Sequence, residues 1–403
     1  MFSRRGGRAG RDGAGARRGA GLSLLLLPAL LSHVALAFTR RASPSDPYAK
    51  VGAIIPDGKD APADVAPVNA KQSRRFLVAT FPSLRQVGYC HLPDNVWRPL
   101  VIGEVAEPRG VAVDRQSARL FVADPPNKVI WWYQLSVNPA GLLVTAGEQK
   151  AAVEGVVADG LTVNGIGDLY FTGRMASSRS NHSSIFRQDA ASILSGRTME
   201  PAEIYTRSNT GTPNPKVWVP SGIAVDALFV YWGNLEGGKK HGSVVKGSRL
   251  NVGLLSQDRQ LRALSTSVDE VRGMTATGTH IFYLSPSGVR GVLKSSATPT
   301  DDPAFGLLAA GPPERHAAPR PGRPPAPAPK PWSPAGIAWD GDNTLYFTDA
   351  ANGAVYTLPA LNMNAHNLTR YSEAPGIHGL AVVGFAGGGA SGSSAAPVAA
   401  RAA

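Results

Sequence analysis

The 403 residues include 45 glycines and 33 prolines and only 17% charged residues, a composition that favours many short strands joined by turns and excludes a bundle of long helices. Most of the net charge of +12 lies outside the repeated sequence described below, in residues 1–37, 38–74 and 312–330 and at Arg401. A nucleic-acid binder carries its basic charge on the folded domain, so we expect no nucleic-acid partner.

Residues 1–37 have the pattern of a secretory signal peptide. An arginine-rich start leads into the apolar run 22–31 and the small-residue site Ala35-Leu36-Ala37, so we predict cleavage after Ala37 and a secretory or extracellular location. Two alternatives remain. The signal stays uncleaved and anchors the protein to a membrane, or Phe38 and the basic stretch after it form a bipartite presequence for a complex plastid. Residues 38–74 are expected to be an N-terminal arm or a presequence remnant.

One short phrase, a glycine followed by alternating aliphatic residues, recurs six times. The copies are 109–114, 159–163, 221–226, 272–276, 335–340 and 378–382. The glycine is the second residue of each copy, and the spacing of 43 to 63 residues suits a four-stranded propeller blade. An aromatic-rich strand follows each of the first five copies, at 120–124, 169–172, 229–232, 281–284 and 345–349. Third strands such as 128–133, 243–246 and 354–358 come after polar turns.

The sixth phrase runs directly into the Gly/Ala/Ser-rich segment 386–403, which we expect to be a disordered tail. The missing strands are found at the other end of the repeats, where 76–80, 86–92 and 99–105 match the second, third and fourth strands. We therefore predict an all-β, six-bladed β-propeller of four-stranded antiparallel blades over residues 75–385, with the last blade closed by N- and C-terminal strands. The proline-rich insertion 312–330 is expected to project as a loop.

The paired strands resemble the YWTD repeats of the LDL-receptor class B propellers. Tyr346-Phe347-Thr348-Asp349 is the best match and Tyr231-Trp232-Gly233-Asn234 is a degenerate one. The phrases are also similar to NHL and gluconolactonase-like blades. The resemblance covers residues 75–385 and implies a six-bladed ring without implying one activity. For the gluconolactonase-like group it also implies a divalent cation at the mouth of the channel, held largely by Asp, Asn and Glu.

The residue before each repeat glycine is expected near one mouth of the channel. In ring order these residues are Arg109, Asp159, Ser221, Arg272, Ala335 and His378. Arg109 and Arg272 come from opposite blades and, with His378, would clamp a carboxylate or phosphate. The alternative is that Arg109 pairs with Asp159 and the other residues line a hydrated channel.

We expect no cofactor, because Asp159 alone among these six matches the Asp, Asn and Glu pattern of such a cation site. Calcium would be the metal if one were bound, and Glu107 or Glu270 would have to add oxygen ligands. We predict a non-catalytic binding module for a protein or a small ligand, including an anionic one, with Arg109, Asp159, Ser221, Arg272 and His378 as its candidate residues. The alternative is a metal-dependent lactonase- or esterase-like hydrolase that uses Asp159.

Neither Gly-x-Ser-x-Gly nor His-Glu-x-x-His occurs, so no residue is assigned a catalytic role. Asn181 and Asn367 begin N-glycosylation triplets. Cys90 is the single cysteine and is expected to be a buried apolar side chain. Trp131, Trp132, Tyr133, Trp232 and Trp339 are expected to pack between blades.

Overall fold

The computed structural model describes residues 74–385, except 93, 179–181, 197–198, 208–215, 240, 250–260, 297–329 and 362–367. All of these residues belong to one compact unit, Val51–Ala403. The signal peptide, nearly all of the N-terminal arm and of the proline-rich insertion, the tail, and both glycosylation candidates, Asn181 and Asn367, lie outside the described residues. The single α-helix that is described, α1 (Ala190–Ser195), is far too short to cross a membrane.

Six antiparallel sheets form the blades, which we number from the first repeat phrase. Blade 1 is β4 (Val111–Asp114), β5 (Arg119–Asp124), β6 (Val129–Val137) and β7 (Leu143–Glu154). Blade 2 is β8 (Val156–Val163), β9 (Leu169–Met175), β10 (Ser184–Gln188) and β11 (Ala202–Tyr205). Blade 3 is β12 (Pro220–Val225), β13 (Phe229–Asn234), β14 (Gly242–Ser248) and β15 (Arg262–Val268).

The remaining blades follow the same order from the innermost strand outward. Blade 4 is β16 (Met274–Ala276), β17 (His280–Ser285) and β18 (Gly288–Leu293). Blade 5 is β19 (Pro334–Trp339), β20 (Thr344–Asp349), β21 (Ala354–Pro359) and β22 (Thr369–Glu373). Blade 4 therefore has three strands among the described residues, and the chain at 297–329, beyond β18, is not described.

Blade 6 is built from both ends of the described chain, as predicted. Its order is β23 (Leu380–Phe385), β1 (Arg74–Phe81), β2 (Gln86–His91) and β3 (Trp97–Ile102), with the short 3₁₀ turn η1 (Pro82–Leu84) between β1 and β2. β1 and β23 are antiparallel, with Leu77 opposite Val382. β3 begins two residues before the predicted start and ends three residues before the predicted end.

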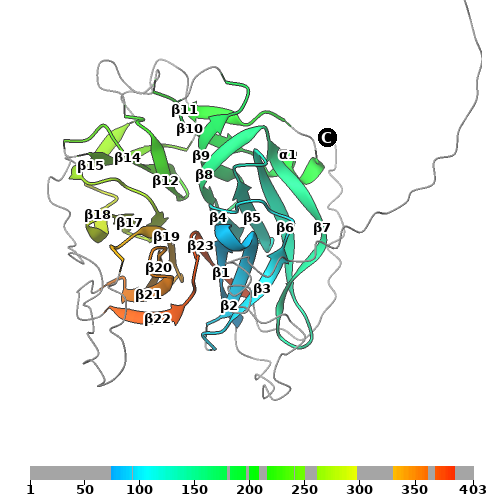
Figure 1. Cartoon of the computed structure of the whole chain (residues 1–403). Coiled ribbons are helices and arrows are strands. Elements are labelled where there is room, and N and C mark those ends of the chain that lie inside the picture. The colour runs from blue at the N-terminus through cyan, green and yellow to red at the C-terminus, as the bar shows by residue number, and fades with distance from the viewer. Residues whose placement is uncertain are drawn as a thin grey trace, which may run out of the picture. The chain divides into compact units, whose positions relative to one another are not determined.

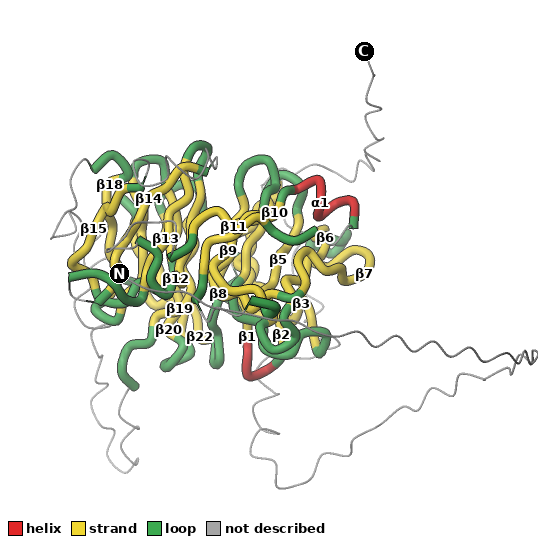
Figure 2. The backbone as a smooth tube through the Cα atoms, turned by 90° about the horizontal axis from the view of Figure 1, so that it is seen from above, coloured by secondary structure: helices red, strands yellow, loops and turns green. Residues whose placement is uncertain are grey.

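The six inner strands contact one another in sequence, β4–β8–β12–β16–β19–β23, and β23 returns to β4. Figure 1 shows the inner strands around the centre, with the blue β1 beside the orange-red β23. The turned view in Figure 2 places β7 and α1 at the periphery. Pairing the first strand with the last leaves no open sheet edge at the seam, which is the physical advantage of closure.

The core consists of six apolar clusters among the described residues, and each cluster joins two neighbouring blades. Trp232 is fully buried against Tyr205 of blade 2, with ring centroids 5.1 Å apart. Tyr133 is buried, and Trp131, Trp132 and Trp339 pack partly buried against these clusters. Packing of aromatic side chains between blades is thus confirmed. Cys90 is also fully buried, as expected, and burial raises the pKa of its thiol to about 12.

The repeat glycines are required where one blade meets the next. A Cβ on Gly110 would lie 2.1 Å from the carbonyl oxygen of Asp159, the residue before the next repeat glycine. The same contact recurs around the whole ring at 2.1–2.7 Å, ending with Gly379 against the Arg109 carbonyl. A Cβ essentially never lies within 3.0 Å of a backbone oxygen, so no side chain fits at these positions unless the backbone moves. The glycines therefore set the close approach of the inner strands and the width of the channel.

Candidate functional site

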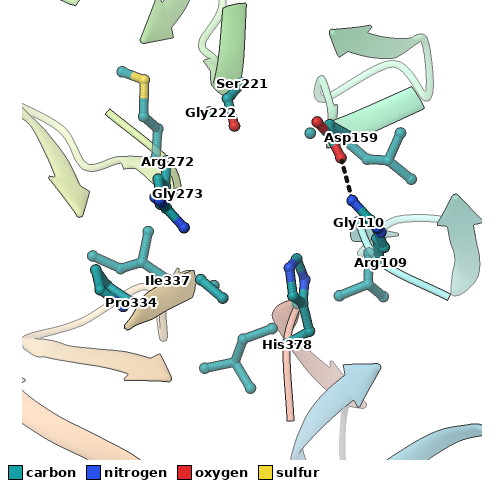
Figure 3. Close-up of a pocket in the computed structure, with 18 of the residues that line it drawn as sticks. Arg109, Gly110, Asp159, Ser221, Gly222, Arg272, Gly273, Pro334, Ile337 and His378 are labelled. Atoms are coloured by element: carbon teal, nitrogen blue, oxygen red, sulfur yellow. Dashed lines mark ion pairs between the residues drawn. The ribbon is translucent and has the colours of Figure 1, made fainter. Parts of the chain in front are cut away.

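A cavity of about 310 Å³ opens at one end of the channel. Its mouth brings together all six residues that precede the repeat glycines: Arg109, Asp159, Ser221, Arg272, Ala335 and His378. Figure 3 shows Arg109 and Arg272 reaching into the cavity from opposite sides, as expected for blades 1 and 4. The predicted convergence of these positions is therefore present, and ligand binding by them stays a prediction.

Irregular strand pairing aims several of these residues. In blades 2, 3 and 5 the ladder between the first and second strands shifts register around Asp159, Ser221 and Ala335. In the other three blades the inner strand begins only after the repeat glycine. Such breaks in a ladder turn side chains away from the regular alternation, and here they leave the mouth residues free to face the channel.

Threonine side chains hold three of the blade junctions at the mouth. The Thr172 hydroxyl accepts from the Gly160 N–H at 3.0 Å and donates to the Ser221 carbonyl of the next blade at 2.6 Å. Thr80 and Thr348 make the equivalent pair of bonds in blades 6 and 5. Because each hydroxyl joins two blades, these threonines fix the backbone that carries the mouth residues.

Arg109 is held by two acidic side chains. Its Nε and Nη2 donate to Glu107 at 2.9 and 2.7 Å, and its Nη1 lies 3.8 Å from Asp159. The fully buried Asp124 accepts the backbone N–H groups of Ala106 and Glu107, both at 2.9 Å, and so positions this loop. The alternative in which Arg109 pairs with Asp159 is thus partly realised, with Glu107 as the closer partner.

Arg272 has the same arrangement with fewer partners. Its Nη2 donates to Glu270 at 2.8 Å, which uses one of the five guanidinium N–H donors. Its neighbours around the mouth are Ser221 and Ala335, and neither carries a charge. Arg272 is 45% exposed at its side chain. It is therefore the less neutralised of the two arginines.

His378 adds a neutral ring to the mouth. Burial lowers the pKa of His378, and the positive charge of Arg109 lowers it further. Its Nδ1 is buried and has no hydrogen-bond partner among the described residues. The lowered pKa favours the uncharged imidazole, so His378 adds no positive charge to the mouth at neutral pH.

The sequence-based prediction missed a second ring below the mouth. One aliphatic side chain from each blade, the residue after each repeat glycine, lines the cavity: Val111, Leu161, Ile223, Met274, Ile337 and Leu380. Each is at most 8% exposed. We call these six residues the floor of the cavity. The signal for them was present in the repeat, because every phrase has an aliphatic residue at this position.

The residues at the mouth do not fit the divalent cation that the gluconolactonase-like resemblance implied. Calcium takes about six to eight oxygen ligands. Asp159 is the only carboxylate among the six mouth positions, and Glu107 and Glu270 are each bonded to an arginine. No group of three or more His, Cys, Asp or Glu that could hold a metal ion occurs in the described part of the chain.

No protein-family model matches this chain, and no curated protein matches its sequence. Similar solved structures include a nidogen–laminin complex, with 12% identity, a TM-score of 0.49 and coverage of 77% of this chain and 98% of the other. A gluconolactonase from Xanthomonas campestris has 15% identity, a TM-score of 0.44 and coverage of 72% and 87%. A PQQ-bound aldose sugar dehydrogenase from Streptomyces coelicolor has 14% identity, a TM-score of 0.43 and coverage of 68% and 84%. The six-bladed fold itself is established by the strand order and the ring of inner-strand contacts given above.

Proposed function

We propose that the protein is a non-catalytic binding module whose cavity holds a small anionic ligand. One observation carries the proposal: Arg109 and Arg272 extend from opposite blades into the same cavity (Figure 3). Guanidinium groups donate charge-assisted hydrogen bonds to carboxylates and phosphates, and two of them on facing walls suit one anion between them. A volume of about 310 Å³ suits a small ligand.

The glutamates beside the arginines orient them without saturating them. The Arg272–Glu270 pair is 45% and 43% exposed, and the Arg109–Glu107 pair is 43% and 40% exposed. Ion pairs this exposed contribute little, about 0–1 kcal/mol. Arg272 keeps four donors beyond its bond with Glu270, whereas Arg109 also lies beside Asp159. Arg272 is therefore the main contact for the anion.

Acetate and inorganic phosphate are suitable probes, with binding followed by NMR titration. Arg272→Gln should weaken acetate binding by about tenfold or more, because hydrogen bonds to a charged group are lost. Glu270→Gln should leave acetate binding unchanged or tighten it, because it removes a competing negative charge and keeps the donors. Arg370→Gln is the matched control, since Arg370 forms an exposed pair with Glu373 on the outer strand of blade 5.

Equal acetate affinity in the wild type and Arg272→Gln would refute the proposal. The hydrolase alternative is tested on the same preparation by metal analysis and by a screen with esters and lactones. A stoichiometric divalent metal together with turnover that is lost in Asp159→Asn would replace the binding function with that alternative.

A further inference from the structure

We infer that the ligand is amphiphilic, with its anionic group at the mouth and a short apolar group on the floor. This inference rests on the proposed function and adds the chemical class of the ligand. The cavity is layered along the channel axis, because the mouth residues, which include the charged Arg109, Asp159 and Arg272, and the aliphatic residue after each repeat glycine line the same space. The two layers are separated by the repeat glycines themselves.

The floor has one aliphatic side chain from each blade. At five of the six junctions this side chain approaches the glycine of the preceding blade, for example Leu161 against Gly110 and Ile223 against Gly160, with the added Cβ placed 3.2 and 3.3 Å away. The same relation holds for Met274, Ile337 and Val111. These side chains therefore cover the blade junctions and present carbon to the cavity, so this end offers an apolar group a surface away from water.

At three of the six blade junctions the backbone carbonyl at the mouth is already hydrogen-bonded. The carbonyl oxygens of Arg109, Ser221 and His378 already accept from Thr80, Thr172 and Thr348. A polar group pushed below the mouth would lose its bonds to water and find those carbonyls engaged, which carries a free-energy penalty. An apolar group at that depth has no hydrogen bonds to water to lose.

Blade 4 supplies both ends of the proposed contact. Arg272 stands at the mouth and Met274, the first residue of β16, on the floor, two residues further along the chain. The next blade has Ala335 at the mouth, which adds only a methyl group beside Arg272, and Ile337 below it. Ligand can therefore pass from Arg272 to the floor along the blade 4–blade 5 junction. Methionine is well suited to such a surface because its flexible thioether adapts to the group it contacts.

The test compares acetate, butanoate, hexanoate and hexylammonium by NMR titration on the folded wild-type protein. Affinity should rise by about fourfold for each methylene group that enters the floor. We expect hexanoate to bind at least about tenfold more tightly than acetate, and Arg272→Gln to weaken both acids. Hexylammonium should bind more weakly than hexanoate, because it presents the wrong charge to Arg272.

The possible failures are distinguishable. If acetate binds as tightly as hexanoate, the inference that the ligand is amphiphilic is wrong while the proposal of anion binding stands. The floor would then only fill the centre of the ring. If hexylammonium matches or exceeds hexanoate, the anion proposal is wrong and the exposed Asp159 is the better contact. If none of the four binds, both proposals fail.

A floor variant adds a readout that anion binding alone would not move. Ile337→Ala should shift the preferred acid to a longer chain, because it deepens the cavity. Folding of the variant is checked by its thermal unfolding. An unchanged chain-length profile in folded Ile337→Ala would overturn the assignment of the apolar end to this floor. If Ile337→Ala does not fold, the wild-type series decides the question alone.

Discussion

Adding one methyl group at a repeat glycine should destabilise the whole ring. A Cβ on Gly110 would stand 2.1 Å from the Asp159 carbonyl oxygen, so blades 1 and 2 must separate at their inner strands. Overpacking a tight contact costs about 1–3 kcal/mol, and a backbone neighbour cannot rotate away, so Gly110→Ala should cost about 3 kcal/mol or more. For a domain of this size that corresponds to a fall in Tm of about 6 °C.

Gly278→Ala is the matched control. Gly278 is exposed in the turn before β17, and its Cβ would have no heavy atom within 4 Å. This substitution should change stability by less than about 1 kcal/mol, with a gain from the stiffer unfolded chain. Differential scanning calorimetry of both variants measures the difference. If Gly110→Ala melts together with Gly278→Ala, the close approach of the inner strands is not what the repeat glycines provide.

Three further outcomes are expected from the same structure. Thr172→Val should lower the free energy of unfolding by about 1–3 kcal/mol in urea titrations, because the two backbone groups that its buried hydroxyl joins lose their partner; unchanged stability would contradict the bridging role. Asp114→Asn should cost about 3–5 kcal/mol, since it leaves the charge of Arg119 buried; the two side chains are 2.8 Å apart and each is 4% exposed, and a loss below about 1 kcal/mol would argue against a buried pair. Burial lowers the pKa of His378, so its contribution to stability is present above pH 6.5 and is lost as the pH falls below that value. His378→Gln should therefore flatten the acid side of the stability profile without abolishing its slope, because burial also lowers the pKa of His280; an unchanged profile would contradict the assignment.

The ring could be predicted from the sequence because its constraint is local and repeated. Each phrase needs a glycine at the point where it contacts the backbone of the next blade. The sixth phrase has no second strand after it in the sequence, and β1 takes that place. The residues at the mouth could be predicted from the same repeat, since the residue before each glycine lies one position nearer to the end of the channel. These inferences depend on strand periodicity, which a sequence displays directly.

Features that depend on contacts between distant segments were harder to predict. The Glu-x-Arg-Gly pattern at Glu107 and Glu270 was visible, but the bonding of Glu107 to Arg109 depends on the loop that Asp124, the last residue of β5, holds in place. β7 was not predicted because residues 146–150 are mostly exposed and 148–150 are polar, and its pairing with β6 defines the strand. α1 was likewise missed, although Asp189 caps it through the Ser192 N–H.

Closure of the ring by its two ends is the claim on which the mouth, the cavity and both proposals depend. Arg75 and Gly384 are directly opposed on β1 and β23, and a Cβ on Gly384 would meet no atom closer than 3.9 Å. Directly opposed residues on antiparallel strands have Cα atoms about 4.5–5.5 Å apart, which is within the range of a disulfide. Cys90 is buried and its thiol pKa is raised, so it does not compete for the new cysteines. Oxidised Arg75→Cys/Gly384→Cys should therefore cross-link within the chain and melt at a higher temperature than its reduced form. Absence of the cross-link, or the same yield from the distant pair Arg75→Cys/Gly278→Cys, would contradict the closed ring.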